Sequence, residues 1–290
     1  MSHGKEPPAP RISVCVPTYQ GAAHIGECLT SIASQSGVQL EIIVCDDRSS
    51  DGTIDIVRNT ARAFPKVDWV IRENPERLGM VENWNACVAL AQHPLLKILG
   101  QDDVLLPHCL AAQARILEAH PSVALMSSRR VIINAAGREI LRAPAPFDYG
   151  MLSGKQAAIR CLLSGTNTIG DPVAVLSRTD LIRSLGGFDR SFRYCTDVAM
   201  LMRLLSRGDF FFDPTPRVGY RVHAGAVGNS SQQIVVSEFT RCLELAERSL
   251  HIRFTAETRR FVAFKSHVLS LVRRRLYGIL NAWPFVSRPR

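Results

Sequence analysis

The stretch Leu95-Leu96-Lys97-Ile98-Leu99-Gly100-Gln101-Asp102-Asp103 has the pattern of a buried β-strand that ends in two adjacent carboxylates. Two neighbouring anions repel each other unless a cation or a positioned hydroxyl compensates their charge. Mg²⁺ and Mn²⁺ prefer oxygen ligands, so the pair predicts a site for a divalent metal and its phosphate ligand. An Asp-Asp pair is also a common turn or helix-capping signal, and the pair alone leaves that interpretation open.

Two other apolar runs end in polar residues in the same way. Residues 12–16 lead into Pro17-Thr18-Tyr19-Gln20, and residues 40–45 lead into Asp46-Asp47-Arg48-Ser49-Ser50-Asp51-Gly52-Thr53. A helical pattern follows each strand, which is typical of an α/β fold with an open parallel sheet. We therefore expect the ligand site at the carboxyl edge of this sheet.

The remaining periodicity predicts further elements along the chain. Helices are expected over residues 21–35, 53–64, 81–91, 153–163 and 196–206, with Ser153 and Thr196 as N-caps and another helix opening at Pro107. Strands are expected over residues 67–71, 123–126 and 173–176, and residues 131–137 suggest a strand and hairpin turn. Residues 142–150 contain two prolines and a glycine, which predicts a seam between two halves of the domain.

Composition favours an enzyme of the cytoplasm. The first ten residues contain no apolar run, so no signal peptide is expected. The cysteines form no Cys-x-x-Cys pair, which argues against a zinc site and a disulfide framework. We expect the cysteines to be small residues of the core. They are Cys15, Cys28, Cys45, Cys87, Cys109, Cys161, Cys195 and Cys242.

The formal net charge of +9 is concentrated at the end of the chain. Residues 241–290 hold eleven Lys and Arg against three Glu, whereas the first 240 residues are almost neutral. A nucleic-acid enzyme is expected to carry positive charge around its binding groove, so this distribution argues against a nucleic-acid partner.

The basic segment also has apolar residues at helical spacing, which are Phe261, Phe264, Val268, Val272, Leu276 and Ile279. No apolar run approaches the length of a membrane-spanning helix. One hypothesis is an interfacial helix on an anionic membrane surface, which places the enzyme at the inner face of the cell membrane. The other is a helix packed on the catalytic domain or on a dimer partner, and the sequence leaves both open.

The ordered motifs resemble those of family 2 glycosyltransferases of the GT-A fold. They are Val16-Pro17-Thr18-Tyr19, Asp46 to Thr53, the segment from Glu73-Asn74 through Gly79 to Asn83-Trp84-Asn85, Gln101-Asp102-Asp103, Gly186-Gly187-Phe188-Asp189, Thr196-Asp197 and Tyr220-Arg221-Val222-His223. The resemblance implies a Rossmann-like, mostly parallel sheet flanked by helices, with a C-terminal helical extension. The expected domains are a disordered tail at 1–10, a GT-A domain at 11–230 and the basic extension at 231–290. Within the GT-A domain, the nucleotide half covers 11–141 and the acceptor half covers 150–230.

The resemblance also implies where the donor binds. Pro17, Thr18, Tyr19 and Asp47 line the pocket for the base and ribose, and Asp102 reaches the ribose or a water near the metal. A turn proline with a packed tyrosine, and an aspartate that caps a turn, are the structural alternatives. Tyr19 offers an aromatic face and Asp47 offers an acceptor for a ring N–H.

Three further positions carry the implied chemistry. Asp103 is the expected ligand of Mn²⁺ or Mg²⁺, with His223 as a further metal or phosphate ligand, although a lone histidine at a strand end is often polar surface. Asp197 matches the family's catalytic carboxylate, while its position in a first helical turn is also explained by the helix dipole. Gln101, Thr196 and Trp84 stand where relatives commonly have an acid, an acid and an arginine.

The function expected from these residues is that of an inverting, metal-dependent hexosyltransferase. It would move a sugar from a nucleotide-diphosphate donor to a saccharide or lipid-linked acceptor, in polysaccharide or glycolipid biosynthesis at the cell surface. The alternatives are a non-catalytic, membrane-associated protein that binds a nucleotide sugar or carbohydrate, and a sugar nucleotidyltransferase. The latter class is disfavoured because Pro17-Thr18-Tyr19 stands where its glycine-rich loop is expected.

Overall fold

A single mixed sheet of ten strands forms the centre of the computed structural model, which describes residues 8–223 and 232–282. The strand order is β3-β2-β1-β4-β9-β6-β10-β5, with β7 beside β6 and β8 beside β10. The bounds are β1 Arg11–Thr18, β2 Gln39–Asp46, β3 Asp68–Glu73, β4 Leu95–Ile98, β5 Val104–Leu105, β6 Val123–Ile133, β7 Glu139–Arg142, β8 Gly150–Leu152, β9 Val175–Arg178 and β10 Asp209–Arg221.

The first four strands are all parallel and form the part of the sheet that the sequence predicts. β1 pairs with β2 on one side and β4 on the other, and β2 pairs with β3. Almost every residue of β1, β2 and β4 is buried, as expected for parallel strands covered on both faces. The carboxyl ends of β1 and β4 therefore lie side by side.

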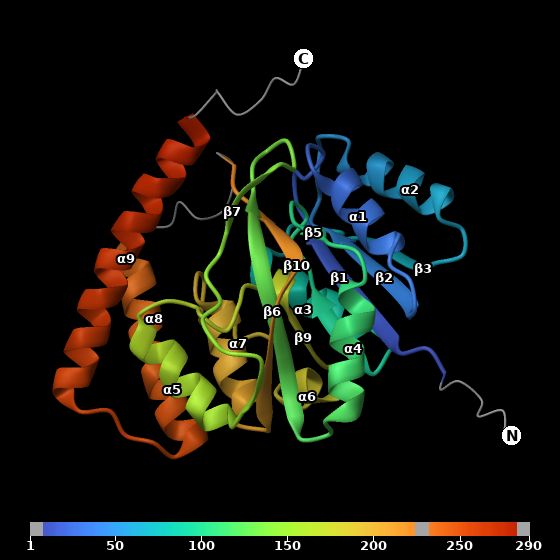
Figure 1. The fold of residues 1–290 in the computed structure, drawn as a ribbon. Coiled ribbons are helices and arrows are strands. Elements are labelled where there is room, and N and C mark those ends of the chain that lie inside the picture. The colour runs from blue at the N-terminus through green and yellow to red at the C-terminus, as the bar shows by residue number, and fades with distance from the viewer. Residues whose placement is uncertain (1–7, 224–231, 283–290) are drawn as a thin grey trace, which may run out of the picture.

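Helices cover both faces of the sheet (Figure 1). On one face, α1 (Ile25–Ala33), α2 (Thr53–Ala63) and α4 (Cys109–Ala119) share a core with alternate strand residues such as Val14 and Val44. On the other face, α3 (Met80–Leu90) lies along β1 and β2, α6 (Thr179–Ser184) along β9 and α7 (Thr196–Leu205) along β6, in a core that includes Cys15 and Ile43. All eight cysteines are buried and free, which confirms their prediction as core residues.

The middle of the sheet differs from the sequence prediction at β6. Separate strands were expected at 123–126 and 131–133 because four polar residues lie between them, but β6 is continuous. The polar residues have distant partners: Arg129 Nε donates to Ala143 O at 2.6 Å, and Arg130 pairs with Asp171 at 2.5 Å. The expected hairpin after residue 133 is present, since β6 and β7 pair antiparallel.

The two expected helix caps have different outcomes. Ser153 caps α5 (Gly154–Ser164), as predicted, and the structure adds that it forms a complete capping box with Gln156. Thr196 is not the N-cap of α7, because the helix already includes it and Cys195 takes the capping position. The buried Thr196 hydroxyl has no hydrogen-bond partner.

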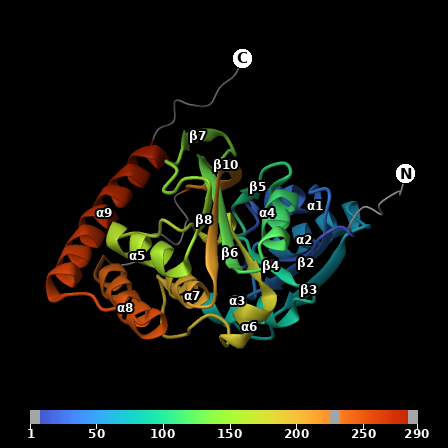
Figure 2. The same ribbon diagram turned by 60° about the horizontal axis from the view of Figure 1, so that its bottom comes forward.

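The C-terminal helices α8 (Gln232–Leu250) and α9 (Ala256–Ala282) lie with α5 at the side of the molecule away from α1 and α2 (Figures 1 and 2). Phe239, Leu243 and Val262 are buried in the same core as α7. In the described part of the chain, no helix is long and apolar enough to cross a membrane.

Lys97 of β4 is fully buried between the sheet and α4. Its ammonium donates to Gln113 Oε1 at 3.0 Å and to Val175 O at 2.9 Å, so it joins β4 to α4 and β9. Burial lowers the pKa of Lys97 from its ordinary value of 10.5 to about 8. Neither hydrogen bond of Lys97 reaches the Asp102-Asp103 pair.

The buried ammonium predicts a pH dependence of stability. Between pH 8 and pH 10.5 the unfolded chain keeps the Lys97 proton that the folded chain releases, so the free energy of unfolding rises with pH in this window. The contribution amounts to about 3 kcal/mol across the window. Urea unfolding of wild type and Lys97→Met at several pH values measures it as the difference between the two curves. The exposed Lys66→Met variant is the control, and an equal slope in all three proteins would contradict the prediction.

Candidate functional site

Gln101 joins the carboxyl ends of β1 and β4. Its side-chain oxygen accepts from the Thr18 hydroxyl and from Tyr19 N at 2.8 Å, and its amide donates to Tyr19 O at 3.0 Å. Gln101, which stands where relatives commonly have an acid, therefore connects the ends of the two strands. The structure thus brings Thr18 and Tyr19 next to the Asp102-Asp103 pair.

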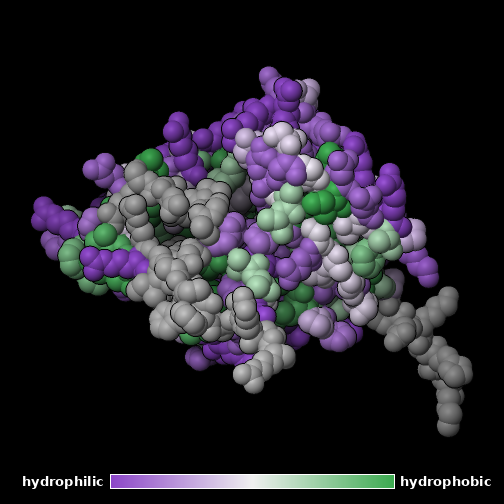
Figure 3. All heavy atoms as spheres, turned by 90° about the horizontal axis from the view of Figure 1, so that it is seen from above, coloured by the Kyte–Doolittle hydropathy of each residue, from purple (hydrophilic) through white to green (hydrophobic). Residues whose placement is uncertain are grey.

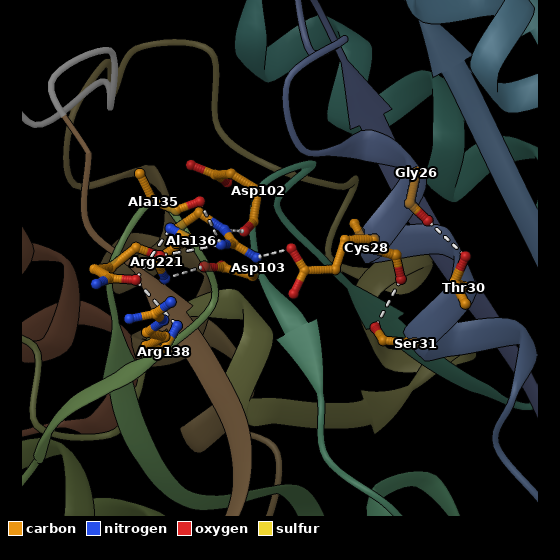
Figure 4. Close-up of polar contacts among 12 residues, drawn as sticks. Gly26, Cys28, Thr30, Ser31, Asp102, Asp103, Ala135, Ala136, Arg138 and Arg221 are labelled. Atoms are coloured by element: carbon orange, nitrogen blue, oxygen red, sulfur yellow. Dashed lines mark hydrogen bonds and ion pairs between the residues drawn. The ribbon is translucent and has the colours of Figure 1, made fainter. Parts of the chain in front are cut away.

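The Asp102-Asp103 pair lies against the end of β10 (Figure 4). The backbone N–H of Arg221 donates to Asp103 Oδ1 at 2.9 Å, and Arg221 Nε donates to Asp102 O at 2.6 Å. Asp103 is buried, whereas Asp102 is partly exposed. Arg221 of β10 therefore binds the backbone carbonyl of Asp102 and the carboxylate of Asp103.

The guanidinium of Arg221 is completely buried and makes three further contacts. Its NH1 donates to Asn134 O at 3.0 Å and Ala135 O at 3.1 Å, in the β6–β7 turn. Its NH2 forms an ion pair with Glu27 of α1 at 2.7 Å. Arg221 thus ties α1 and the β6–β7 turn to the loop that carries the two aspartates.

His223 lies beside Asp102, where its Nε2 is 2.9 Å from Asp102 Oδ2. Its ring centroid is 4.9 Å from that of His24, which precedes α1. Burial, with Arg221 and His223 close by, lowers the pKa of His24. Two imidazoles and two carboxylates therefore gather at this edge.

The charge of this group fits a divalent cation. Burial raises the pKa of Asp103 well above its ordinary value, and the neighbouring Asp102 carboxylate adds to the effect. A cation would offset both costs, because it compensates the charge of the ionised form. In the described ranges no three His, Cys, Asp or Glu side chains form a complete metal site. Mg²⁺ commonly takes one or two carboxylates and completes its shell with substrate phosphates, so the pair suits a metal that arrives with a diphosphate.

Asp47 organises the loop that follows β3. Its carboxylate accepts from Leu78 N at 2.6 Å, Gly79 N at 2.8 Å and Asn74 Nδ2 at 3.1 Å. Gly79 has φ +84°, a backbone conformation that favours glycine. The structure therefore gives Asp47 a loop-fixing role, and a nucleobase would have to use its remaining acceptor capacity.

Tyr19 faces a cation from the same loop. The Arg77 guanidinium lies 3.9 Å from the centre of the Tyr19 ring. Pro17 is the last but one residue of β1 and partly buried, and Thr18 is buried. The residues expected around a base and ribose thus lie together, with Arg77 over the aromatic face.

Asp197 lies in the first turn of α7 and accepts from Asn167 Nδ2 at 2.9 Å. Asn167 also bonds both backbone groups of Gly170, so the loop before β9 is shaped around the carboxylate. Asp197 lines an apolar cavity with about 380 Å³ of space, part of it open to solvent, between α7, β4 and β9. The next residue of this loop, Asp171, is close enough to raise the pKa of Asp103.

The loop before α7 is held by Glu238 of α8. This buried carboxylate accepts from the backbone N–H groups of Arg193, Tyr194 and Cys195, at 2.8, 2.7 and 2.9 Å. Three N–H groups just before α7 are thereby satisfied by a residue more than forty positions further along the chain. Asp197 therefore depends on α8 for its position.

Sequence reasoning missed the roles of Glu27, Glu238 and the Arg221 side chain. The Tyr220-Arg221-Val222-His223 motif pointed to this edge, yet nothing local marks Arg221 as buried or Glu27 as its partner. Glu238 lies in an ordinary helical pattern and carries no signal of its own.

Comparison with known proteins identifies the family of this chain. Residues 13–183 match the sequence profile of "Glycosyl transferase family 2". The chain belongs to this family. It is 36% identical to the Mycobacterium tuberculosis protein MT1568 over 217 residues, which cover 72% of this chain and 66% of that protein. It is also 36% identical to the abequosyltransferase RfbV of Salmonella typhimurium over 119 residues, covering 39% of this chain and 34% of RfbV.

Solved structures confirm the GT-A fold for this family 2 chain. The structure of S. aureus TarS 1–349 in complex with UDP-GlcNAc has a TM-score of 0.68 at 17% identity and covers 93% of this chain and 75% of that one. The mannosyltransferase PcManGT from Pyrobaculum calidifontis, in complex with GDP-Man and Mn²⁺, has a TM-score of 0.61 at 18% identity, with coverages of 93% and 76%. This chain spans less than two thirds of the length of the curated relatives described above.

The Arg221 network predicts a large loss of stability from a substitution that keeps the charge. Arg221→Lys removes the forked contacts to Glu27, Asp102 O and the β6–β7 turn, and leaves buried acceptors without donors. We expect the free energy of unfolding to fall by about 3 kcal/mol, measured by urea unfolding at neutral pH.

The control is Arg142→Lys, in an exposed ion pair with Glu139. This variant is expected to change the free energy of unfolding by less than about 0.5 kcal/mol. Equal effects of the two substitutions would show that Arg221 does not stabilise the edge in this way.

Proposed function

We propose that this chain is a metal-dependent, inverting glycosyltransferase, which moves a sugar from a nucleotide-diphosphate donor to a hydroxyl of a saccharide or lipid-linked acceptor. The observation that carries the proposal is the Asp102-Asp103 pair, fixed by Arg221 at the carboxyl edge of the sheet and joined through Gln101 to Tyr19. Family membership and the GT-A fold support it.

The donor nucleotide would bind between the ends of β1 and β2. Tyr19 offers its ring to the base once Arg77 shifts, and Arg77 is then placed to meet the diphosphate. Asp47 keeps the adjoining loop in shape and has acceptor capacity for a ring N–H. Pro17 and Thr18 would form the floor, and Asp102 would contact the ribose.

Asp103 and His223 are the residues proposed to hold Mn²⁺ or Mg²⁺. The bound ion would neutralise the departing nucleoside diphosphate. PcManGT, solved with GDP-Man and Mn²⁺, supports a metal at this type of fold. Arg221 keeps the Asp103 carboxylate oriented through its backbone N–H.

Asp197 is the proposed general base. Its carboxylate would take the proton from the acceptor hydroxyl as the oxygen attacks the anomeric carbon, and Asn167 keeps it oriented. A single displacement of this kind inverts the configuration at that carbon. The apolar pocket beside the carboxylate offers space next to the proposed base.

The acceptor and the setting are proposed from the relatives. RfbV is named an abequosyltransferase, and a Bacillus subtilis relative is a putative glycosyltransferase, EpsE. We infer a role in cell-surface polysaccharide or glycolipid synthesis, on the cytoplasmic side of the membrane. A non-catalytic nucleotide-sugar binding protein and a sugar nucleotidyltransferase remain as alternatives for the experiments below.

Nucleotide binding is expected to require both the metal and Asp103. A thermal-shift panel of UDP, GDP, dTDP and CDP, each with and without Mn²⁺, should give one nucleotide that raises the melting temperature with metal present. Asp103→Asn should lose the metal-dependent part of the shift, because it removes the charge that compensates the ion. The exposed Asp148→Asn variant is the control. If no nucleotide binds under any condition, both the enzyme and the donor-binding alternative fail.

Asp197→Asn should separate catalysis from binding. We expect kcat for transfer or donor hydrolysis to fall by about 10²- to 10⁴-fold, while the metal-dependent thermal shift with the nucleotide is unchanged. NMR of the product should show the opposite anomeric configuration to the donor. Nucleotide binding without turnover in wild type would favour the non-catalytic alternative. Release of pyrophosphate from a mixture of a nucleoside triphosphate and a sugar 1-phosphate would favour the nucleotidyltransferase.

A further inference from the structure

The outward face of α9 is apolar. The exposed fractions are 55% for Phe261, 68% for Phe264, 38% for Val268, 40% for Leu271 and 55% for Val272. Phe261, Phe264, Val268 and Leu271 follow one another at spacings of three and four, and Val272 is four residues after Val268, so the five form one stripe along the helix. The stripe is about 17 Å long at 1.5 Å per residue. We call these five residues the α9 stripe.

The packing of α9 fixes the direction in which the stripe faces. Val262 and Ser266 are buried against α5 and α8. Gly165, which caps α5, comes so close that an added Cβ would lie 3.0 Å from Ser266 N. Lys265 Nζ donates to Leu163 O at 3.2 Å, and Arg259 pairs with Glu247 of α8. Rotation of α9 to bury the stripe would break all of these contacts.

The charge of α9 selects among partners. The helix contains six Arg and Lys residues and a single acid, Glu257. Arg260 and Arg275 are exposed near the two ends of the stripe. A second copy of this chain would bring another strongly basic helix against the stripe, which is electrostatically unfavourable. An anionic surface with an apolar interior complements both the stripe and its flanking cations.

We propose that the α9 stripe inserts into the surface of a bilayer containing anionic lipid, with the helix lying parallel to the membrane. The proposal goes beyond sugar transfer and does not depend on it. α9 is not of the kind that spans a membrane, and its apolar face with basic flanks is typical of interfacial helices.

This orientation keeps the site accessible. α9 forms one edge of the molecule and ends on the same side as β10, whose last residues hold the Asp102-Asp103 loop (Figure 1). Figure 3 shows green apolar spheres among purple ones at the left edge, which α9 forms in Figure 1. A membrane along α9 therefore meets one flank of the enzyme and leaves the carboxyl edge of the sheet uncovered.

Vesicle co-sedimentation tests the proposal with the full chain. Wild type should bind vesicles of phosphatidylcholine and phosphatidylglycerol in equal parts, bind pure phosphatidylcholine at least about tenfold more weakly, and be released by high salt. The double variant F261S/F264S should bind the mixed vesicles about 10- to 100-fold more weakly. The double variant R260E/R275E should lose about tenfold or more on the mixed vesicles only.

Matched controls are Leu141→Ser, an exposed apolar residue of β7, and Arg115→Glu, an exposed cation of α4. Both should bind as wild type does, and all variants should keep the wild-type circular dichroism because the changed side chains are exposed. Sedimentation velocity gives the other decisive result. A wild-type dimer that dissociates in F261S/F264S, or a monomer that fails to bind mixed vesicles at low salt, would overturn the proposal.

Discussion

The contacts of the buried Arg221 guanidinium are the interaction on which the candidate site depends. A guanidinium removed from water is costly unless it is hydrogen-bonded, and here three backbone carbonyls and the half-exposed Glu27 carboxylate accept four hydrogen bonds from it. Because losing any of these contacts is costly, α1, the β6–β7 turn and the aspartate loop are held in one arrangement. The Arg221 N–H, which donates to Asp103, fixes the Asp103 carboxylate in the same arrangement.

The same edge shows how a departure from a family pattern can be compensated. Gln101 stands where an acid was expected, and its neutral amide both donates to and accepts from the end of β1. A carboxylate at this position could accept but not donate. The site consequently keeps two aspartates, one buried and one facing His223, which suits a cation that brings its own phosphate ligands.

Sequence patterns predicted the elements that depend on local periodicity. The buried strands β1, β2 and β4, their polar ends and the Ser153 N-cap follow from residue types alone, and the GT-A fold was expected from the ordered motifs. The continuity of β6 and the start of α7 were not predictable in this way. Arg129, Arg130 and the N–H groups before α7 find their partners far along the chain, at Ala143, Asp171 and Glu238. The positions of Asp103 after β4 and of Asp197 in a first helical turn were predicted, but the side chains that contact them were not.

Through Glu238, the C-terminal helix α8 supports the turn that carries Asp197. The expected boundary near residue 231 divides the chain by charge, but three hydrogen bonds from one carboxylate cross it to reach the turn before Asp197. A chain shortened at that boundary would lose these hydrogen bonds, and it would expose the core residues that Phe239 of α8 now covers. The turn before Asp197 therefore keeps its hydrogen bonds only when α8 is present. Insertions, fusions and domain exchanges in this protein should therefore keep α8 joined to the domain that carries the motifs.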